Sequence, residues 1–168
     1  FIKFSLKALN DFSEFFVKEN KLDFEKFIDF YELPSPVKDN ERVNRIKEKL
    51  RKLKSDTTLE KEKLRNENVY SRCIAMCLET RPDYCFEEHI SEMLNYGTTR
   101  VEIGVQTLSD EIHKIIKRGH TNQDSIKATQ LLKDSFLKVT YHSMLNLPGS
   151  TIENDKFDHK TSLCTTPG

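Results

Sequence analysis

The chain has 168 residues, of which 36% are hydrophobic and 32% charged, a composition typical of a polar globular protein and not of a disordered one. Its 27 basic and 27 acidic residues cancel, so bulk charge gives no argument for nucleic-acid binding. No apolar run approaches the ~18 residues of a membrane span, and no signal peptide is visible, so we expect a cytoplasmic protein without membrane contacts. The length suits one domain but is short of the roughly 250 residues of a complete eight-fold β/α barrel. The chain opens at Phe1 inside an apolar-periodic pattern, so we interpret it as the interior of a longer protein.

Residues 1–70 carry the apolar periodicity of helices. Residues 1–17 place six apolar side chains on one helical face, and shorter patterns follow at 23–31 and 43–53. Thr57 opens a capping-box pattern, which predicts a charged helix ending near residue 68. We therefore expect a mainly helical segment over residues 1–70.

From residue 71 the pattern changes to strands that alternate with helices. We expect strands at 73–78, 100–106 and 138–144, and helices at 87–96, 110–117 and 121–134. Such alternation is typical of right-handed βαβ units around a parallel sheet. The predicted fold is therefore α/β: a partial (β/α) barrel over residues 71–155, preceded by the helical segment. Residues 156–168 have no apolar period and are expected to be a disordered or truncated tail.

Polar residues stand at or near the ends of the three expected strands. Glu79 ends the first, Gln106 the second, and His142 lies near the end of the third. In a parallel barrel these ends share one rim, where Arg118 could also arrive and pair with a carboxylate or phosphate. The alternative is structural: Gln106 and His142 would satisfy loop backbones, and Glu79 would pair with Arg81. The joint placement favours a ligand site.

The cysteines Cys73 and Cys77 suggest a metal site at first, with Cys85 and His89 nearby. On the expected strand the first two would lie about 13 Å apart, too far for one small metal centre. Buried, reduced cysteine is therefore the favoured interpretation, and we predict no metal ligands in this chain.

Residues 45–54 form a basic run around one glutamate. It could contact RNA phosphates, although such a run is more often a solvated helix face. The candidate RNA-binding residues are Arg45, Lys47, Lys49, Arg51, Lys52 and Lys54.

Four motifs in this order carry a resemblance to a known family: ETRPDYC at 79–85, RVEIGVQ at 100–106, KRGHT at 117–121 and LPGS at 147–150. Together they resemble the catalytic subunit of elongator, especially its archaeal form. That family consists of radical S-adenosylmethionine and acetyltransferase enzymes that modify the wobble uridine of tRNA. The resemblance covers about residues 1–153.

The resemblance implies a barrel that binds S-adenosylmethionine and a [4Fe–4S] cluster, makes a radical on the acetyl group of acetyl-CoA and delivers it to uridine 34 of tRNA. By motif, Glu79 and Gln106 would approach the methionine or ribose part of S-adenosylmethionine. Arg118 would pair with its carboxylate, and His142 would line the same rim. The implied partners are tRNA, the missing parts of the same enzyme and other elongator subunits.

The chain also departs from the family pattern. The cluster-binding cysteine motif would lie before Phe1 and the acetyltransferase domain after the last residue, so we expect neither a bound cluster nor activity from this chain alone. Phe136 stands where the family usually has glycine, and Leu145 replaces a frequent proline. We therefore expect a fragment of a radical S-adenosylmethionine tRNA uridine(34) acetyl- or carboxymethyl-transferase. The alternatives are a non-catalytic, partner-binding remnant of the barrel and an RNA-binding module that uses residues 45–54.

Overall fold

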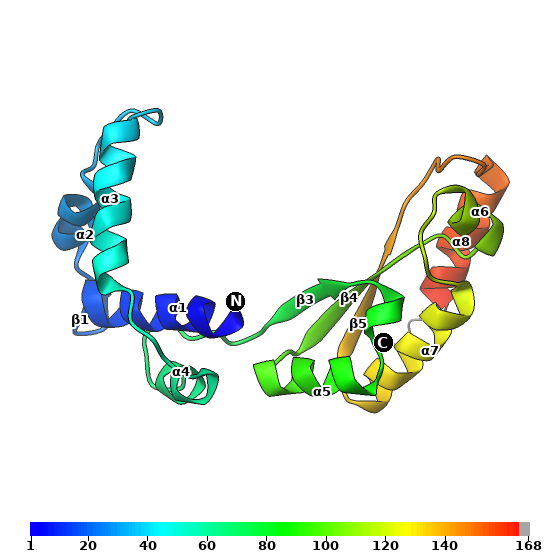
Figure 1. The fold of residues 1–168 in the computed structure, drawn as a ribbon, viewed down its shortest axis with the longest axis horizontal. Coiled ribbons are helices and arrows are strands. Elements are labelled where there is room, and N and C mark those ends of the chain that lie inside the picture. The colour runs from blue at the N-terminus through cyan, green and yellow to red at the C-terminus, as the bar shows by residue number, and fades with distance from the viewer. Residues whose placement is uncertain (165–168) are drawn as a thin grey trace. The chain divides into compact units, whose positions relative to one another are not determined.

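The structure, a computed structural model, describes residues 1–164 and divides into two compact units, Phe1–Ile74 and the chain from Ala75 onward. Each unit is described by itself, and Figure 1 locates their elements. Among the described residues, no helix combines the length and the apolar character that a bilayer crossing requires.

The first unit is helical, as expected for this part of the chain. Helix α4 packs on α1, and the buried Glu62 of α4 accepts a hydrogen bond of 2.8 Å from the Asn10 amide of α1. The sequence pattern did not reveal a short antiparallel hairpin that follows α1. The elements are α1 (Ile2–Phe16), β1 (Val17–Lys18), β2 (Lys21–Leu22), α2 (Phe24–Tyr31), α3 (Asn40–Leu53) and α4 (Leu59–Asn66).

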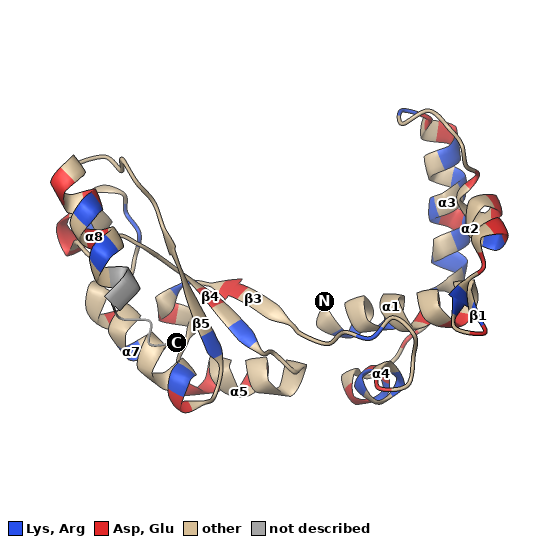
Figure 2. Ribbon diagram, turned by 180° about the vertical axis from the view of Figure 1, so that it is seen from behind, with Lys and Arg blue, Asp and Glu red and all other residues tan. Residues whose placement is uncertain are grey.

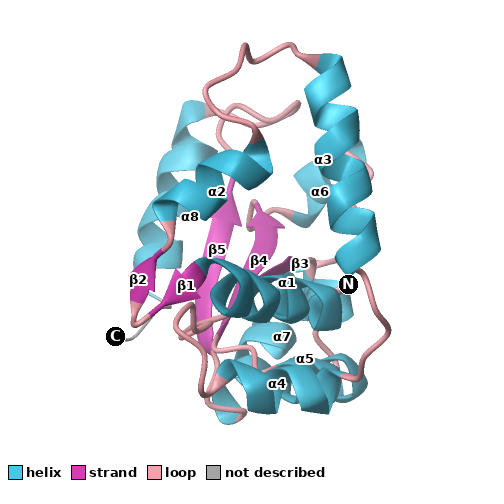
Figure 3. Cartoon of the chain, turned by 90° about the vertical axis from the view of Figure 1, so that its left-hand side faces the viewer, coloured by secondary structure: helices cyan, strands magenta, loops and turns pink. Residues whose placement is uncertain are grey.

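The second unit is built on a parallel sheet in the order β3-β4-β5, which confirms the predicted α/β fold class (Figure 3). Strand β4 is central, and its register places Glu102 between Glu79 and Thr140. The elements are β3 (Cys77–Thr80), the 3₁₀ turn η1 (Pro82–Tyr84), α5 (Glu87–Tyr96), β4 (Arg100–Gln106), α6 (Asp110–Ile115), α7 (Asn122–Asp134), β5 (Lys138–Ser143) and α8 (Ile152–Cys164).

The core of this unit lies on one face of the sheet. Val101, Ile103 and Val105 alternate along β4 and are fully buried. They pack with apolar side chains of α5 and α7, such as Ile90 and Leu132, and these two helices cover that face. Because side chains of a strand alternate between faces, the residues between them point to the opposite face, which carries the polar groups.

The first strand begins later than predicted. The apolar run from residue 73 led us to expect a strand over 73–78, but β3 starts at Cys77, which pairs with Arg100 at the first position of β4. A strand needs a hydrogen-bonded neighbour, and β4 supplies none before Arg100. Cys73 therefore lies outside the sheet, and its main-chain N–H donates to Asn66.

The expectation of an irregular tail from residue 156 is wrong up to Cys164, because α8 covers Ile152–Cys164. This helix lacks a one-sided apolar stripe, so periodicity could not reveal it. Polar contacts hold it instead: Asp158 accepts hydrogen bonds from Thr107 Oγ1 at 2.6 Å and from the N–H of Leu108. The expected tail at residues 165–168 lies outside the described residues.

Phe136, between α7 and β5, has a left-handed backbone conformation. Its φ is +61°, and its side chain is 97% exposed. The ring therefore gains little from packing while its Cβ crowds the backbone, a conformation that glycine adopts without strain. This position fits the glycine that the resemblance led us to expect there.

We predict that Phe136→Gly raises the stability of the chain by about 1 kcal/mol, because the left-handed strain is released. Thermal and urea unfolding measure the change. Phe136→Ala is the matched control, since it removes the same exposed ring but keeps the Cβ atom. An equal gain from alanine and glycine would contradict the strain argument.

Candidate active site

The polar face of the sheet brings together residues from all three strands. His142 of β5 lies between two carboxylates: its Nδ1 is 3.1 Å from Glu79 Oε1, and its Nε2 is 2.8 Å from Glu102 Oε2. Each ring nitrogen thus lies within hydrogen-bond distance of a carboxylate oxygen. Glu79 and His142, two predicted site residues, are thus in direct contact. The alternative in which Glu79 pairs with Arg81 is wrong, because Arg81 pairs with Asp83.

Glu102, in the centre of this group, was not among the predicted site residues. It contacts His142 on one side and the Cys77 thiol on the other, and these two hydrogen bonds hold the pKa of its carboxyl below the usual value. Burial, together with the Glu102 carboxylate, raises the pKa of Cys77. The sequence contained a signal for Glu102, since it lies four residues before Gln106, which is two periods along the same strand face.

Gly104 makes room for the other two predicted site residues. An added Cβ would lie 2.6 Å from an Arg118 guanidinium nitrogen and 2.8 Å from the Gln106 amide nitrogen. The same guanidinium donates to the Gly104 carbonyl at 3.1 Å. Arg118 therefore reaches the polar face of β4 beside Gln106, as predicted, and only glycine leaves space for this approach.

The carboxyl end of β4 is irregular where the site residues meet. The register between β4 and β5 shifts between Ile103 and Gln106, a bulge of the kind that re-aims side chains near sites. Gln106 is buried and left-handed, with φ at +70°. A non-glycine residue in this conformation costs on the order of 1–3 kcal/mol and marks a candidate functional position.

Several buried polar atoms beside Gln106 lack a partner within the described part of the chain. They include Nε of Arg118 and both ring nitrogens of His120, a side chain that is 4% exposed. Buried donors of this kind are normally satisfied by water or a ligand. Because its Nε has no partner there, the Arg118 guanidinium keeps a hydrogen-bond donor besides the nitrogen that donates to the Gly104 carbonyl.

The cysteines do not form a metal site among residues 1–164, where no group of three or more His, Cys, Asp or Glu side chains could hold an ion. Cys85 is packed in the core, where burial raises the pKa of its thiol to about 12. Such a thiol is inert as a ligand, because metals bind the thiolate.

The basic run lies on α3, where positive and negative residues mix (Figure 2). Arg45 and Lys49 both pair with Glu32, and Arg51 pairs with Glu48. Lys54 lies over the Phe4 ring. Four of the six candidate RNA-binding residues thus make an ion pair or a cation–π contact within their own unit. Among the described residues, Lys47 and Lys52 show no such contact. The RNA-binding role remains a prediction.

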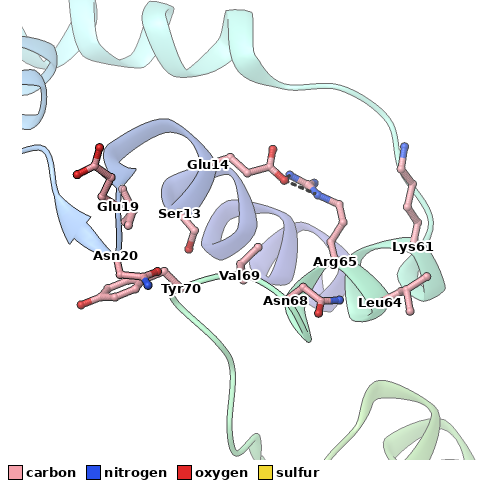
Figure 4. A pocket seen from close by; sticks show the side chains of 11 residues that line it. Ser13, Glu14, Glu19, Asn20, Lys61, Leu64, Arg65, Asn68, Val69 and Tyr70 are labelled. Atoms are coloured by element: carbon pink, nitrogen blue, oxygen red, sulfur yellow. Dashed lines mark hydrogen bonds and ion pairs between the residues drawn. The ribbon is translucent and has the colours of Figure 1, made fainter.

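The helical unit contains a pocket of about 650 Å³ beside α1 and α4 (Figure 4). Arg65 and Glu14 meet across it at 2.8 Å, and Arg65 also pairs with Asp11 and Glu62. The Arg65 guanidinium is therefore already paired with carboxylates of its own unit, whereas Arg118 has no such ion pair within the described residues.

His120 gives this region a pH dependence. Burial, followed by the neighbouring His113 and Arg118, lowers the pKa of His120 below 6.5, and the Val105 main chain and the Asp83 charge partly oppose this shift. The unfolded chain therefore binds a proton between the two pKa values while the folded chain does not, so stability rises with pH in that window. The contribution of neutral His120 to the free energy of unfolding is fully present above pH 6.5 and is lost as the pH falls below that value.

We predict that the melting temperature falls when the pH is lowered from 7.5 to 5.5, and that His120→Phe flattens this dependence. The slope is limited to about 1.4 kcal/mol for each pH unit for a single proton. Calorimetry across this range measures it. Identical slopes for wild type and variant would show that another group is responsible.

Comparison with known proteins adds to this geometry. The family model described as the radical SAM superfamily matches residues 37–159. A tRNA uridine(34) acetyltransferase of Methanocaldococcus infernus is 59% identical over 99 residues, which are 59% of this chain and 18% of that protein. Elongator complex protein 3 of Homo sapiens is 43% identical over 90 residues, 54% of this chain and 16% of that protein.

A solved structure is also similar: the archaeal Methanocaldococcus infernus Elp3 with an N-terminal deletion of residues 1–46. It is 55% identical with a TM-score of 0.62, and the match covers 64% of this chain and 25% of that one. These similarities confirm the expected resemblance to the elongator catalytic subunit family. The chain spans about a fifth of the length of the curated relatives it matches.

Proposed function

The chain belongs to the radical SAM superfamily, and from this we propose that its polar sheet face binds S-adenosylmethionine as part of an enzyme that modifies uridine 34 of tRNA. The proposal carries over to this chain the activity in the names of its relatives. It includes acetyl-CoA as the acyl donor, tRNA as the substrate and a cytoplasmic location. The remaining segments of the enzyme or other elongator subunits would be its protein partners.

One observation carries the proposal: the Arg118 guanidinium lies over Gly104 beside Gln106, with its Nε buried and without a partner in the described chain. A guanidinium with spare donors suits a carboxylate, which it can bind through two parallel hydrogen bonds. The amino-acid end of S-adenosylmethionine has such a carboxylate. These residues therefore fit the ligand.

The acidic half of the same face suits the ribose. Glu79 and Glu102 present carboxylate oxygens, which accept hydrogen bonds from hydroxyl groups. His142 holds both carboxylates in place through its two ring nitrogens, so it orients them and offsets their mutual repulsion. Gln106 has both a donor and an acceptor and would lie between the two halves of the ligand. In an enzyme that also held a reducing cluster, S-adenosylmethionine would supply a carbon radical able to abstract hydrogen, after a one-electron reduction that breaks one of its C–S bonds.

The described cysteines do not fit a [4Fe–4S] cluster. Cys85 is inside the core, Cys77 faces Glu102, and Cys73 belongs to the other unit. A cluster needs several thiolates that converge. We therefore propose that the chain alone is inactive.

We predict that anaerobic reconstitution of the purified chain with iron and sulfide gives no stoichiometric four-iron cluster. Iron and sulfide analysis, with the broad visible absorbance of such clusters, measures this. Cys77→Ser is the control for adventitious binding to the exposed thiol. A stoichiometric cluster in the wild-type chain would contradict the argument from its thiols.

We predict that Arg118→Lys weakens the binding of S-adenosylmethionine to the chain by about tenfold or more, because a charge-assisted bidentate contact is lost. Isothermal titration calorimetry measures the affinity. Arg100→Lys is the matched control, since Arg100 is at the first position of β4, at the end of the strand away from Gly104 and Gln106, and should be replaced without effect.

Equal losses at Arg100 and Arg118 would indicate a general charge effect and contradict the assigned role. A wild-type chain that binds no S-adenosylmethionine would contradict the proposed function itself.

A second candidate is a non-catalytic, partner-binding role, favoured by the edges of the sheet. Within the described residues, β3 and β5 each pair on one side only. An unpaired strand edge can accept a further strand. The two candidates differ in the affinity of the isolated chain for S-adenosylmethionine, which only the first requires.

A further inference from the structure

We infer that His113 is a positioning residue that sets both Gln106 and Arg118 for ligand binding. This inference rests on the proposed function, because Gln106 and Arg118 are the residues proposed to hold the ligand and His113 would support both. His113 lies on α6 and is 3% exposed. It acts through main-chain groups: its ring contacts the Val105 carbonyl, and its own carbonyl accepts the N–H of Arg118.

The first connection runs through the Val105 carbonyl. The His113 ring approaches this oxygen with Nε2 at 3.0 Å, and the N–H of Thr107 donates to it at 2.9 Å. A carbonyl oxygen has two lone pairs and only accepts, so the ring must carry its proton on Nε2. Val105 and Thr107 flank Gln106. The two hydrogen bonds thus close the turn that holds Gln106 in its left-handed conformation.

The second connection runs through the main chain of His113. Its carbonyl accepts the N–H of Arg118 at 2.9 Å, which ends α6 and directs the following loop back to the sheet. There the guanidinium meets Gly104. One residue thus connects the strand that bears Gln106 with the loop that bears Arg118.

His120 supports this arrangement by packing against the same ring. The two imidazoles meet edge to face, with centroids 4.6 Å apart, and both are buried. The His113 Nδ1 has no hydrogen-bond partner within the described residues and is 3.6 Å from Asp110 Oδ1. Within the described residues, the Nε2 bond to the Val105 carbonyl is therefore the ring's only hydrogen bond, so its loss should loosen the turn.

The test compares two substitutions of His113. His113→Phe keeps a ring against His120 but removes the donor, whereas His113→Gln provides a carboxamide N–H near the position of Nε2. We expect His113→Phe to weaken S-adenosylmethionine binding by about tenfold, as for a lost buried hydrogen bond, and His113→Gln to restore most of it. If the Phe variant fails to fold, His113→Asn serves, since its amide ends short of Nε2.

The control separates positioning from general stability. Thr129→Val removes a different buried hydrogen bond of the same unit, the 2.6 Å contact between Thr129 and Tyr141. It should lower the melting temperature while leaving the affinity within about twofold of wild type. Equal affinity losses in Thr129→Val and His113→Phe would reduce His113 to a structural role and overturn the inference.

A ligand-free measurement distinguishes this inference from the proposed function. Amide hydrogen exchange at Thr107 should be about tenfold faster in His113→Phe than in wild type, and near wild type in His113→Gln. If the wild-type chain binds no S-adenosylmethionine, the proposed function fails, and Thr107 exchange still decides whether His113 holds the turn. Unchanged exchange in His113→Phe would overturn the inference whatever the ligand does.

Discussion

The structure of the second unit depends on the two faces of its central strand. Val101, Ile103 and Val105 are buried beneath α5 and α7, so the register and direction of β4 are fixed by the burial of three β-branched side chains. Each contributes roughly 1.5–3 kcal/mol on burial. A shift by one residue would expose all three, so the same register holds Glu102, Gly104 and Gln106 on the other face.

The polar face therefore owes its geometry to the core behind it. Glu79, Glu102 and His142 meet because their three strands are paired in this register, and Arg118 enters because Gly104 has no side chain. The cost appears where β4 ends, in the left-handed backbone of Gln106. Two hydrogen bonds to the Val105 carbonyl offset it, which places the strain at the residue proposed to bind the ligand.

Sequence reasoning was most successful where local signals agreed with long-range packing. The predicted bounds of β4 and α5 match the structure, where Gly97 ends α5 and the side chains of Ser109 and Thr121 cap α6 and α7. In these segments periodicity, capping residues and burial favour the same result. The meeting of Glu79 with His142 was also within reach, since parallel strands present their ends at one rim.

The remaining features depend on partners that no local pattern reveals. The start of β3 is set by where β4 begins, and α8 is held by Asp158 against Thr107, some fifty residues earlier. His113 has the ordinary appearance of a helical residue, and its role arises from a carbonyl eight residues before it. Buried hydrogen bonds between distant residues leave no periodic trace in the sequence.

The most direct test of the account is a map of where S-adenosylmethionine perturbs the chain. Nuclear magnetic resonance spectra of the isotope-labelled protein, recorded during a titration, provide this residue by residue. We expect the largest shifts at Glu102, Gly104, Gln106 and Arg118, with Val101 and Ile103 on the opposite face little affected. Shifts confined to α3 or to the buried face would contradict the account.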